Sequence, residues 1–250
     1  MLRQKVLRVT VLVLWIVISP FALAQKPIWA KGAVPFNFNC IKNVASSQQI
    51  PSPDGKVMVL VKCHALPKND DPTYYLRVTE QNGYAQDFDL EEGAHEVLWS
   101  PDSKAFFVNG GQSAFAGFSV TVYQIDDHGV RKLAVTDAAQ RDMVTSFPPC
   151  KAALRDTEFC KQVEANPEYN MSGLAWVNGS AAVVVMAEVP CASEYGGIMC
   201  QVLGYKLAVP TRNILRRMTA PELKRDWQHS MAWDMRIPDP PIYGAPLPQP

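Results

Sequence analysis

The 250-residue sequence predicts an all-β fold made of blade-like, four-stranded antiparallel repeats, with a short helical insertion and a C-terminal helix. Three observations predict it. The chain is 48% hydrophobic and 19% charged, it contains 20 prolines and 14 glycines, and one turn-and-strand pattern occurs three times. The apolar content excludes an intrinsically disordered protein. The balance of 24 basic and 24 acidic residues lacks the positive charge expected of a nucleic-acid binder.

Residues 1–24 have the layout of a secretory signal peptide, which we exclude from the fold. Basic residues come first, an apolar run over 9–18 follows, and Ala22-Leu23-Ala24 supplies the small residues of a cleavage site. The alternative is an uncleaved membrane anchor. The apolar stretch 9–24 is interrupted by Ser19-Pro20, however, and is shorter than the roughly 20 residues that a span needs. We expect cleavage after Ala24 and a periplasmic or secreted protein.

Three windows of the remaining chain align without gaps. Each has a tight turn followed by a strongly apolar strand. The first begins at Pro51-Ser52-Pro53-Asp54-Gly55-Lys56, the second at Trp99-Ser100-Pro101-Asp102-Ser103-Lys104, and the third at Trp176-Val177-Asn178-Gly179-Ser180. Proline presets the first turn angle, and an aspartate side chain can accept a bond from the backbone just ahead. We therefore treat Trp99, Trp176, Asp54 and Asp102 as the core of a repeat.

Each window is followed by a further β-rich run, a second turn and a last strand, so each repeat is predicted to be a four-stranded meander. The second turns are at Asn82-Gly83, His128-Gly129 and Arg212-Asn213, and Asn-Gly is a strong hairpin signal. The β-repeat domain is assigned to 25–218. The wider gap between the second and third windows indicates an insertion at 138–170, in which Ala152, Ala153 and Leu154 favour a short helix.

The Trp-Ser-Pro-Asp pattern resembles the β-propeller repeat of the TolB and prolyl-oligopeptidase type. Trp99, Ser100, Pro101 and Asp102 match it fully, whereas the first window lacks the tryptophan and the third keeps only Trp176 and the apolar strand. The resemblance covers roughly residues 45–218. It implies that each pattern marks one blade, with the tryptophan packed between blades and the turn leading into an inner strand. Propellers have four to eight blades, so three repeats indicate either an incomplete propeller or a packed multi-sheet body.

Six cysteines in an exported chain indicate disulfides. Their spacing favours the local pairs Cys191–Cys200 and Cys150–Cys160, which leaves Cys40 with Cys63. If 150–160 were one helix, its ends would be about 15 Å apart, too far for a disulfide. In that case the helix breaks near Asp156-Thr157 or the pair is wrong. The closely spaced ligands of a zinc site are absent.

After residue 218 the sequence no longer has the pattern of the β-repeats. Thr219 and Glu222 have the spacing of a helix capping box, and Leu223, Trp227 and Met231 would share one apolar face, which predicts a helix over 219–236. Its expected role is to cover a sheet, with docking of another protein as the alternative. The tail 237–250 is rich in proline and is predicted to be extended.

Motifs for catalysis or cofactor binding are missing. The segment Gly111-Gln112-Ser113-Ala114-Phe115 lacks the closing glycine of a nucleophile elbow, His95-Glu96 lacks the second histidine of a zincin helix, and the chain has no phosphate loop or G-x-G-x-x-G. We therefore expect no cofactor and no metal. A hydrolase using His95, Asp102 and a serine is kept as a minor hypothesis.

Two loops are candidate binding sites. The first contains Gln112 and Phe115 among small residues, and the second is the Cys191–Cys200 loop with Tyr195. Loops of this kind often carry binding on β-scaffolds. The leading hypothesis is a non-catalytic module that binds another envelope or secreted protein, with no nucleic-acid partner and no membrane span after signal cleavage. The alternative is a protein that binds small molecules or glycans through these loops.

Overall fold

A computed structural model describes residues 28–36, 48–64, 73–90, 94–111, 118–147, 169–191, 195 and 198–235. The predicted signal peptide, the Ala152–Leu154 segment and the proline-rich tail lie outside these residues. Within them the chain forms three antiparallel sheets and two short α-helices. The predicted all-β class is confirmed.

Four strands of each sheet are consecutive in the chain, as the meander prediction requires. The first sheet contains β2 (Gln48–Pro51), β3 (Val57–His64), β4 (Thr73–Glu80) and β5 (Ala85–Leu90). The middle sheet contains β6 (Ala94–Trp99), β7 (Ala105–Gly111), β8 (Phe118–Asp126) and β9 (Gly129–Leu133). The third contains β10 (Asn170–Val177), β11 (Ala182–Glu188), β12 (Val202–Ala208) and β13 (Ile214–Thr219).

A fifth strand, β1 (Val34–Phe36), pairs with β6 at the edge of the middle sheet. Its three residues are too few to show a period in the sequence, and the sequence analysis missed it. The chain just before β1 also forms an isolated bridge between Ala30 and Met231. The N-terminal segment thus joins the middle sheet to the C-terminal part of the chain.

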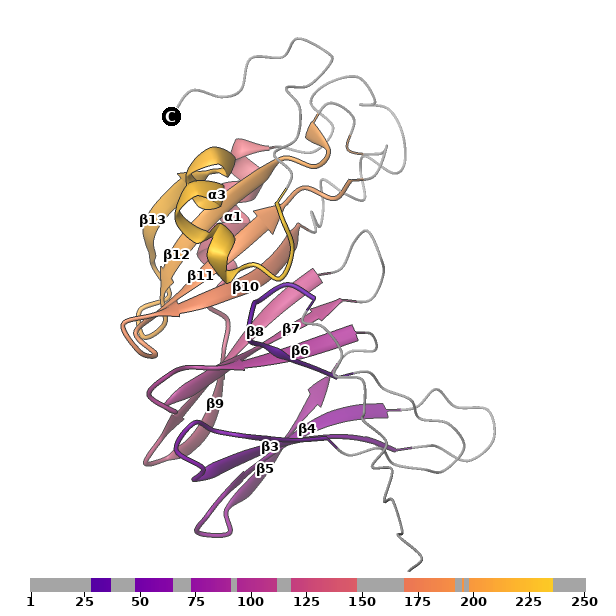
Figure 1. Ribbon diagram of the computed structural model, residues 1–250, viewed down its shortest axis with the longest axis vertical. Helices are drawn as coiled ribbons and strands as arrows, with labels where there is room; N and C mark the ends of the chain where they lie inside the picture. The colour runs from indigo at the N-terminus through magenta and orange to yellow at the C-terminus, as the bar shows by residue number, and fades with distance from the viewer. Residues whose placement is uncertain are drawn as a thin grey trace, which may run out of the picture.

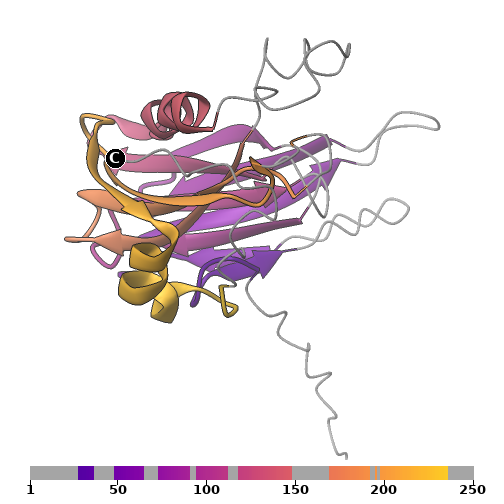
Figure 2. The same cartoon turned by 90° about the horizontal axis from the view of Figure 1, so that it is seen from above.

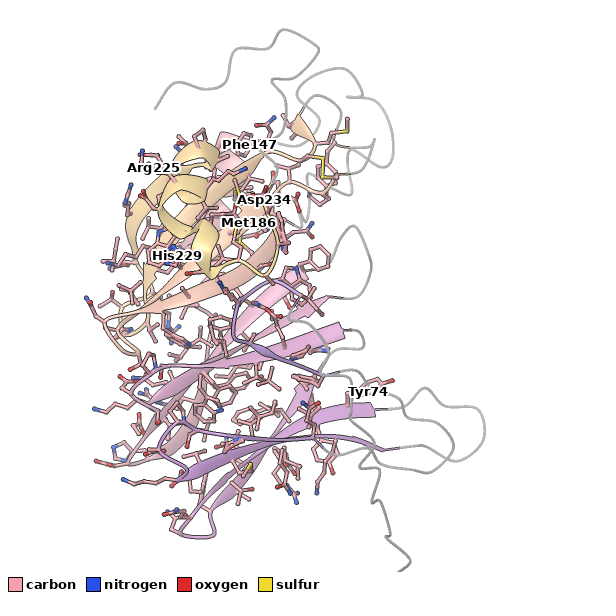
Figure 3. The ribbon with its side chains drawn as sticks, viewed as in Figure 1. Tyr74, Phe147, Met186, Arg225, His229 and Asp234 are labelled. Carbon is pink, nitrogen blue, oxygen red and sulfur yellow. A yellow bond between two sulfur atoms is a disulfide. The ribbon has the colours of Figure 1, made fainter. Side chains whose placement is uncertain are left out.

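The three sheets are stacked face to face (Figure 1). Because alternate side chains of a strand point to opposite faces, β7 serves both spaces between the sheets, with Phe106 in the apolar cluster against the first sheet and Phe107 in the cluster against the third. Side chains fill these spaces (Figure 3). Both phenylalanines are fully buried. The middle sheet is consequently the centre of the molecule.

The two helices lie on opposite sides of the stack (Figure 2). The first, α1 (Asp137–Ser146), opens the predicted insertion and buries Ala139 and Met143 in the cluster between the middle and third sheets. The second, α3 (Ala220–Trp227), starts at the predicted capping box, in which Glu222 accepts hydrogen bonds from the backbone and hydroxyl of Thr219.

The helix α3 covers the outer face of the third sheet, as expected for a cover. Leu223 is fully buried with Val184 and Met218 of that sheet. The helix ends at Trp227, short of the predicted 236, and a single 3₁₀ turn over Gln228–Ser230 follows. Met231 still enters the same cluster because the chain turns back onto the sheet after that turn.

Candidate functional site at the turn edge

The tight turns of the first and second windows are built alike. In each, a serine hydroxyl donates to the aspartate two residues on: Ser52 Oγ to Asp54 Oδ1 at 2.8 Å, and Ser100 Oγ to Asp102 Oδ1 at 2.6 Å. The same serine oxygen accepts a bond from the backbone N–H that begins the next strand, at 3.0 Å in both turns. Two separate segments of the chain therefore adopt the same turn conformation with the same residue types.

The fifth position of these two turns needs a left-handed backbone. Gly55 has φ +72°, and Ser103 adopts φ +60° at the corresponding place. In the third turn the left-handed residues are Asn178 and Gly179, which are two positions and one position before the fifth residue, Ser180. The third turn has neither the serine nor the aspartate of the other two, which accounts for its different path.

Neighbouring turns are joined by the same pair of positions. The Asp54 N–H donates to Ser103 Oγ at 3.1 Å, across the first and middle sheets. The Ser180 N–H and hydroxyl donate to Asp102 Oδ2 at 2.9 Å each, across the middle and third sheets. In both cases the fifth residue of one turn contacts the aspartate position of the turn before it. The turns thus form a continuous row along one edge of the stack (Figure 1).

An open groove of about 920 Å³ runs along this edge, mainly between the first and middle sheets. We call it the turn groove. Its lining residues are Asp54, Lys56, Val57, Glu80, Gln81, Asn82, Asp102, Ser103, Lys104, Gln124, Ile125, Asp126, Asp127 and Ser180. Five carboxylates against two lysines make it acidic, and two of the predicted repeat-core residues, Asp54 and Asp102, lie in it.

Hydrogen bonds favour the ionised form of three of these carboxylates, those of Asp54, Asp102 and Asp126. Partial burial raises the pKa of Asp102, but bonds from Ser100, Ser180 and Lys104 outweigh it and lower that pKa to about 2. The backbone N–H of Lys56 and the Ser52 hydroxyl lower the pKa of Asp54. For Asp126 the backbone N–H of His128 acts in the same direction on the pKa. The groove therefore stays negative well below neutral pH.

The two predicted core tryptophans take corresponding places in adjacent sheets. Trp99 ends β6 and packs on Phe106, with ring centroids 4.8 Å apart, while Trp176 lies near the end of β10 and packs on Phe107 at 5.6 Å. Both are half-buried, less than expected, because they lie beside the turns. Trp176 Nε1 donates to the Leu98 carbonyl of the neighbouring sheet at 3.1 Å, whereas Trp99 Nε1 is buried without a partner.

The other predicted site residues are spread over the molecule. The Cys191–Cys200 disulfide is confirmed (Figure 3), and it closes the loop between β11 and β12. Tyr195 of that loop is half-buried and packs against the cluster between the middle and third sheets. The remaining predicted site residues lie outside the described part of the chain: Gln112, Phe115, Cys40, Cys150, Cys160 and the side chain of Cys63.

The residues of the minor hydrolase hypothesis are not brought together. His95 is near the start of β6, and Asp102 is in the turn beyond the end of that strand. With a rise of about 3.3 Å per strand residue, β6 holds them at opposite ends of the middle sheet. His95 is instead stacked on Phe36 of β1, with ring centroids 5.4 Å apart.

The most extensive buried polar contact was not predicted. Glu96 is fully buried, and its carboxylate accepts bonds from the backbone N–H groups of Ile28, Trp29 and Ala30 and from Asn109 Nδ2. These partners are 13 to 68 residues away in the chain. The carboxylate holds the N-terminal segment against the middle sheet, a role for which the local sequence has no signal.

Two kinds of site are not found in the described part of the chain. No three His, Cys, Asp or Glu side chains there lie close enough together to hold a metal ion. No helix there is long and apolar enough to cross a bilayer. Comparison of the chain with protein-family models, curated proteins and solved structures gives no match.

Proposed function

We propose that this is an exported, disulfide-stabilised β-sheet scaffold that binds another protein, and that the turn groove receives a basic segment of that partner. The observation that carries the proposal is the groove itself, an open concavity of about 920 Å³ where turns of three sheets meet. The disulfide between Cys191 and Cys200 supports export because such bonds persist in oxidising compartments.

The walls of the groove suit recognition rather than turnover. The hydroxyls of Ser103 and Ser180 are each engaged with the neighbouring turn, and none of the described residues that line the groove is a histidine. Its carboxylates are held by turns that are hydrogen-bonded to one another, so they are oriented before a partner arrives. Preorganised charge of one sign favours a partner surface of the opposite sign and speeds their encounter.

We also propose that the three sheets are divergent copies of one blade. Two matching hydrogen-bond patterns support this. Within each of the first two turns, a serine hydroxyl donates to the aspartate two residues on. Between neighbouring turns, the fifth residue of one turn is hydrogen-bonded to the residue at the aspartate position of the turn before it. The resemblance to TolB-type propeller repeats rests on these residues. In this proposal the blades form a stack of three, with the turn groove along one edge.

Site-specific photo-crosslinking tests the binding proposal. A photoreactive amino acid is placed at Gln81 or Gln124 in the groove and, as the control, at Leu215, which is 56% exposed on β13. We expect one stoichiometric adduct from both groove positions in envelope fractions, none from Leu215, and loss of the adduct in an Asp126→Lys, Asp127→Lys variant or in high salt. Equal adducts from all three positions, or adducts that survive charge reversal, would contradict the proposal.

A further inference from the structure

A second, smaller pocket lies between the first and middle sheets, toward the ends of the strands away from the tight turns. Its volume is about 50 Å³, and its lining residues are Asp89, Leu90, His95, Val108, Gly110, Ser119, Thr121, Tyr123 and Lys132. We call it the tyrosine pocket. It shares no lining residue with the turn groove, so the two concavities are separate sites.

One strand supplies the hydroxyl groups of this pocket. Ser119, Thr121 and Tyr123 are alternate residues of β8, so their side chains point to the same face of the middle sheet, the face that meets the first sheet. By strand register, the corresponding residues of the third sheet are Leu203, Tyr205 and Leu207, which are all buried in the core. Bulky side chains close one interface at positions where Ser119 and Thr121 leave the other open.

The hydroxyl of Tyr123 is buried without a hydrogen-bond partner. Tyr123 is 1% exposed, and its hydroxyl makes no hydrogen bond within the described part of the chain, so burial alone raises its pKa. Trp99 Nε1 is the only side-chain nitrogen or oxygen of that part that is both fully enclosed and unpartnered. The Tyr123 hydroxyl therefore reaches open space, and the pocket that Tyr123 lines provides it. Burial of an unpaired hydroxyl is costly, which favours a ligand that accepts a hydrogen bond from it.

The charge that faces the pocket is positive. Lys132 is directly opposite Tyr123 in the pairing of β8 with β9, so it lies on the same face of the middle sheet. Asp89 directs its carboxylate to the outer face of the first sheet, because Phe88 and Leu90 on either side of it face the cluster between the sheets. Of the two charged residues that line the pocket, only Lys132 therefore directs its charge into it.

A glycine keeps the floor of the pocket open. A Cβ atom at Gly110 would lie 2.8 Å from His95 Cδ2 and 3.7 Å from Ser119 Oγ. Any larger residue there would push against the imidazole, which is itself stacked on Phe36. The space above Gly110 is thus bounded by packed rings and stays available to a small ligand.

Size, charge and donors together define the ligand class. A volume of about 50 Å³ accommodates about three to five water-sized groups, which is the size of acetate and too small for an aromatic or pyranose ring. One ammonium group matches one negative charge, and hydroxyl groups donate strongly to carboxylate oxygens. We propose that the tyrosine pocket binds a short-chain monocarboxylate such as acetate. Its oxygens accept bonds from the hydroxyl groups and Lys132, and its hydrocarbon end lies toward the apolar side chains of Leu90 and Val108.

Calorimetric titration of the purified chain with acetate tests the proposal, with acetamide, nitrate and benzoate as comparison ligands. Acetamide has the shape of acetate without its charge, nitrate has the charge without the hydrocarbon end, and benzoate exceeds the volume. We expect acetate to bind with a Kd in the millimolar range, because so few atoms supply little binding energy. Acetamide and nitrate should bind at least about tenfold more weakly, and benzoate not at all.

The charge of Lys132 is tested against its neighbour on the same strand. Lys132→Gln should weaken acetate binding at least about tenfold. The matched control is Arg131→Gln, because Arg131 pairs with Asp126 and does not line the pocket. We expect Arg131→Gln to bind acetate as the parent does.

Removing the Tyr123 hydroxyl separates binding from stability. Tyr123→Phe should weaken acetate binding at least about tenfold, while the melting temperature without ligand stays at or above that of the parent, because the hydroxyl has no partner to lose. The control is Tyr205→Phe. The Tyr205 hydroxyl donates to Asp142 at 2.6 Å and does not line the pocket, so this variant should melt at a lower temperature and bind acetate as the parent does.

Four results would overturn the proposal: no binding of acetate, equal binding of acetamide or nitrate, unchanged binding by folded Tyr123→Phe, or equal effects of Arg131→Gln and Lys132→Gln. If Tyr123→Phe does not fold, the comparison of Lys132→Gln with Arg131→Gln decides.

Discussion

At the scale of single residues, carboxylates organise this protein in two different settings. Asp102 is exposed but accepts bonds from its own turn and from Ser180 of the next. Glu96 is fully buried and gathers three backbone N–H groups of the N-terminal segment. A charge-assisted hydrogen bond is stronger than a neutral one, so each carboxylate can fix segments that are distant in the chain.

The lowered pKa of Asp102 predicts a pH-dependent contribution to stability. A carboxyl group with a folded-state pKa of about 2, below its ordinary 3.8, stabilises the fold above pH 4 and loses that effect as the pH falls toward 2. Because the side chain is exposed to solvent, we expect Asp102→Asn to cost no more than about 1 kcal/mol at pH 7.

Urea unfolding at pH 7 and pH 2.5 measures this difference. The gap between wild type and Asp102→Asn should shrink at the lower pH, because wild-type Asp102 then becomes increasingly protonated. Asp127→Asn, which removes another exposed carboxylate of the turn groove, is the control for the loss of one negative charge. A gap that is constant with pH would show that the hydrogen bonds do not depend on the charge.

At the scale of elements, each sheet contains a meander of four consecutive strands, and the two helices pack against the apolar clusters of the sheets. The tight turns and second turns connect strands that are adjacent in both chain and space. The helix α3 follows β13 directly and folds back on its own sheet, where Leu223 lies against Gly204. A Cβ atom at Gly204 would come within 2.6 Å of the Leu223 side chain, so the glycine makes this close approach possible.

Removing the Leu223 side chain tests the importance of this cover. Leu223 is 0% exposed, and we expect Leu223→Ala to lower the free energy of unfolding by about 2–5 kcal/mol, from lost burial and the cavity left behind. Leu215→Ala, at a 56% exposed leucine of β13, should change it by less than about 0.5 kcal/mol. Chemical denaturation followed by circular dichroism measures both, and equal effects would show that α3 does not stabilise the sheet.

At the scale of the whole molecule, the stack has two internal interfaces and distinct ends. At both internal interfaces, the fifth residue of one turn is hydrogen-bonded to the residue at the aspartate position of the neighbouring turn. The first sheet has Gly55 at the fifth position, and the third has Gly179 at the aspartate position. The first sheet therefore lacks the fifth-position hydroxyl, and the third sheet lacks the carboxylate, that join neighbouring turns inside the stack. The outer face of the third sheet is covered by α3 as well.

Shared cores predict that the three sheets unfold together. Phe106 and Phe107 are adjacent on β7, and each fills a different interface. We expect Phe106→Ala and Phe107→Ala each to cost about 3–5 kcal/mol. Far-UV circular dichroism and tryptophan fluorescence should give coincident transitions in both variants. Separate transitions in either variant would show that one sheet remains folded without its neighbour.

Much of the fold could be predicted from local sequence. Turn residues such as Pro53-Asp54-Gly55 and Asn82-Gly83, set between apolar runs, identify hairpins because turn geometry and strand alternation depend on neighbouring residues alone. The Cys191–Cys200 disulfide and the start of α3 at Thr219 were predictable for the same reason, since each depends on residues fewer than ten positions apart.

The candidate sites were only partly predictable. The repeat pattern selected Asp54 and Asp102, yet their convergence with Asp126 and Glu80 in one groove depends on how the first and middle sheets stack. A second, smaller pocket beside His95 depends on the register of Gly110 with Ser119 and on how the first sheet packs over the middle one. The spacing of these residues in the sequence does not show that they converge. Hydrophobic alternation specifies which face of a strand is buried, but not which sheet covers that face.

Local sequence was therefore enough to establish the all-β class, the three meanders, the Cys191–Cys200 bridge and the first turn of the C-terminal helix. The stacking order, the pairing of β1 with β6, the burial of Glu96 and the two concavities emerge only in three dimensions. The physical reason is the range of the interactions. Turns, caps and alternation are settled within a few residues, whereas Glu96 meets Ile28 across 68 positions that the folded core alone brings together.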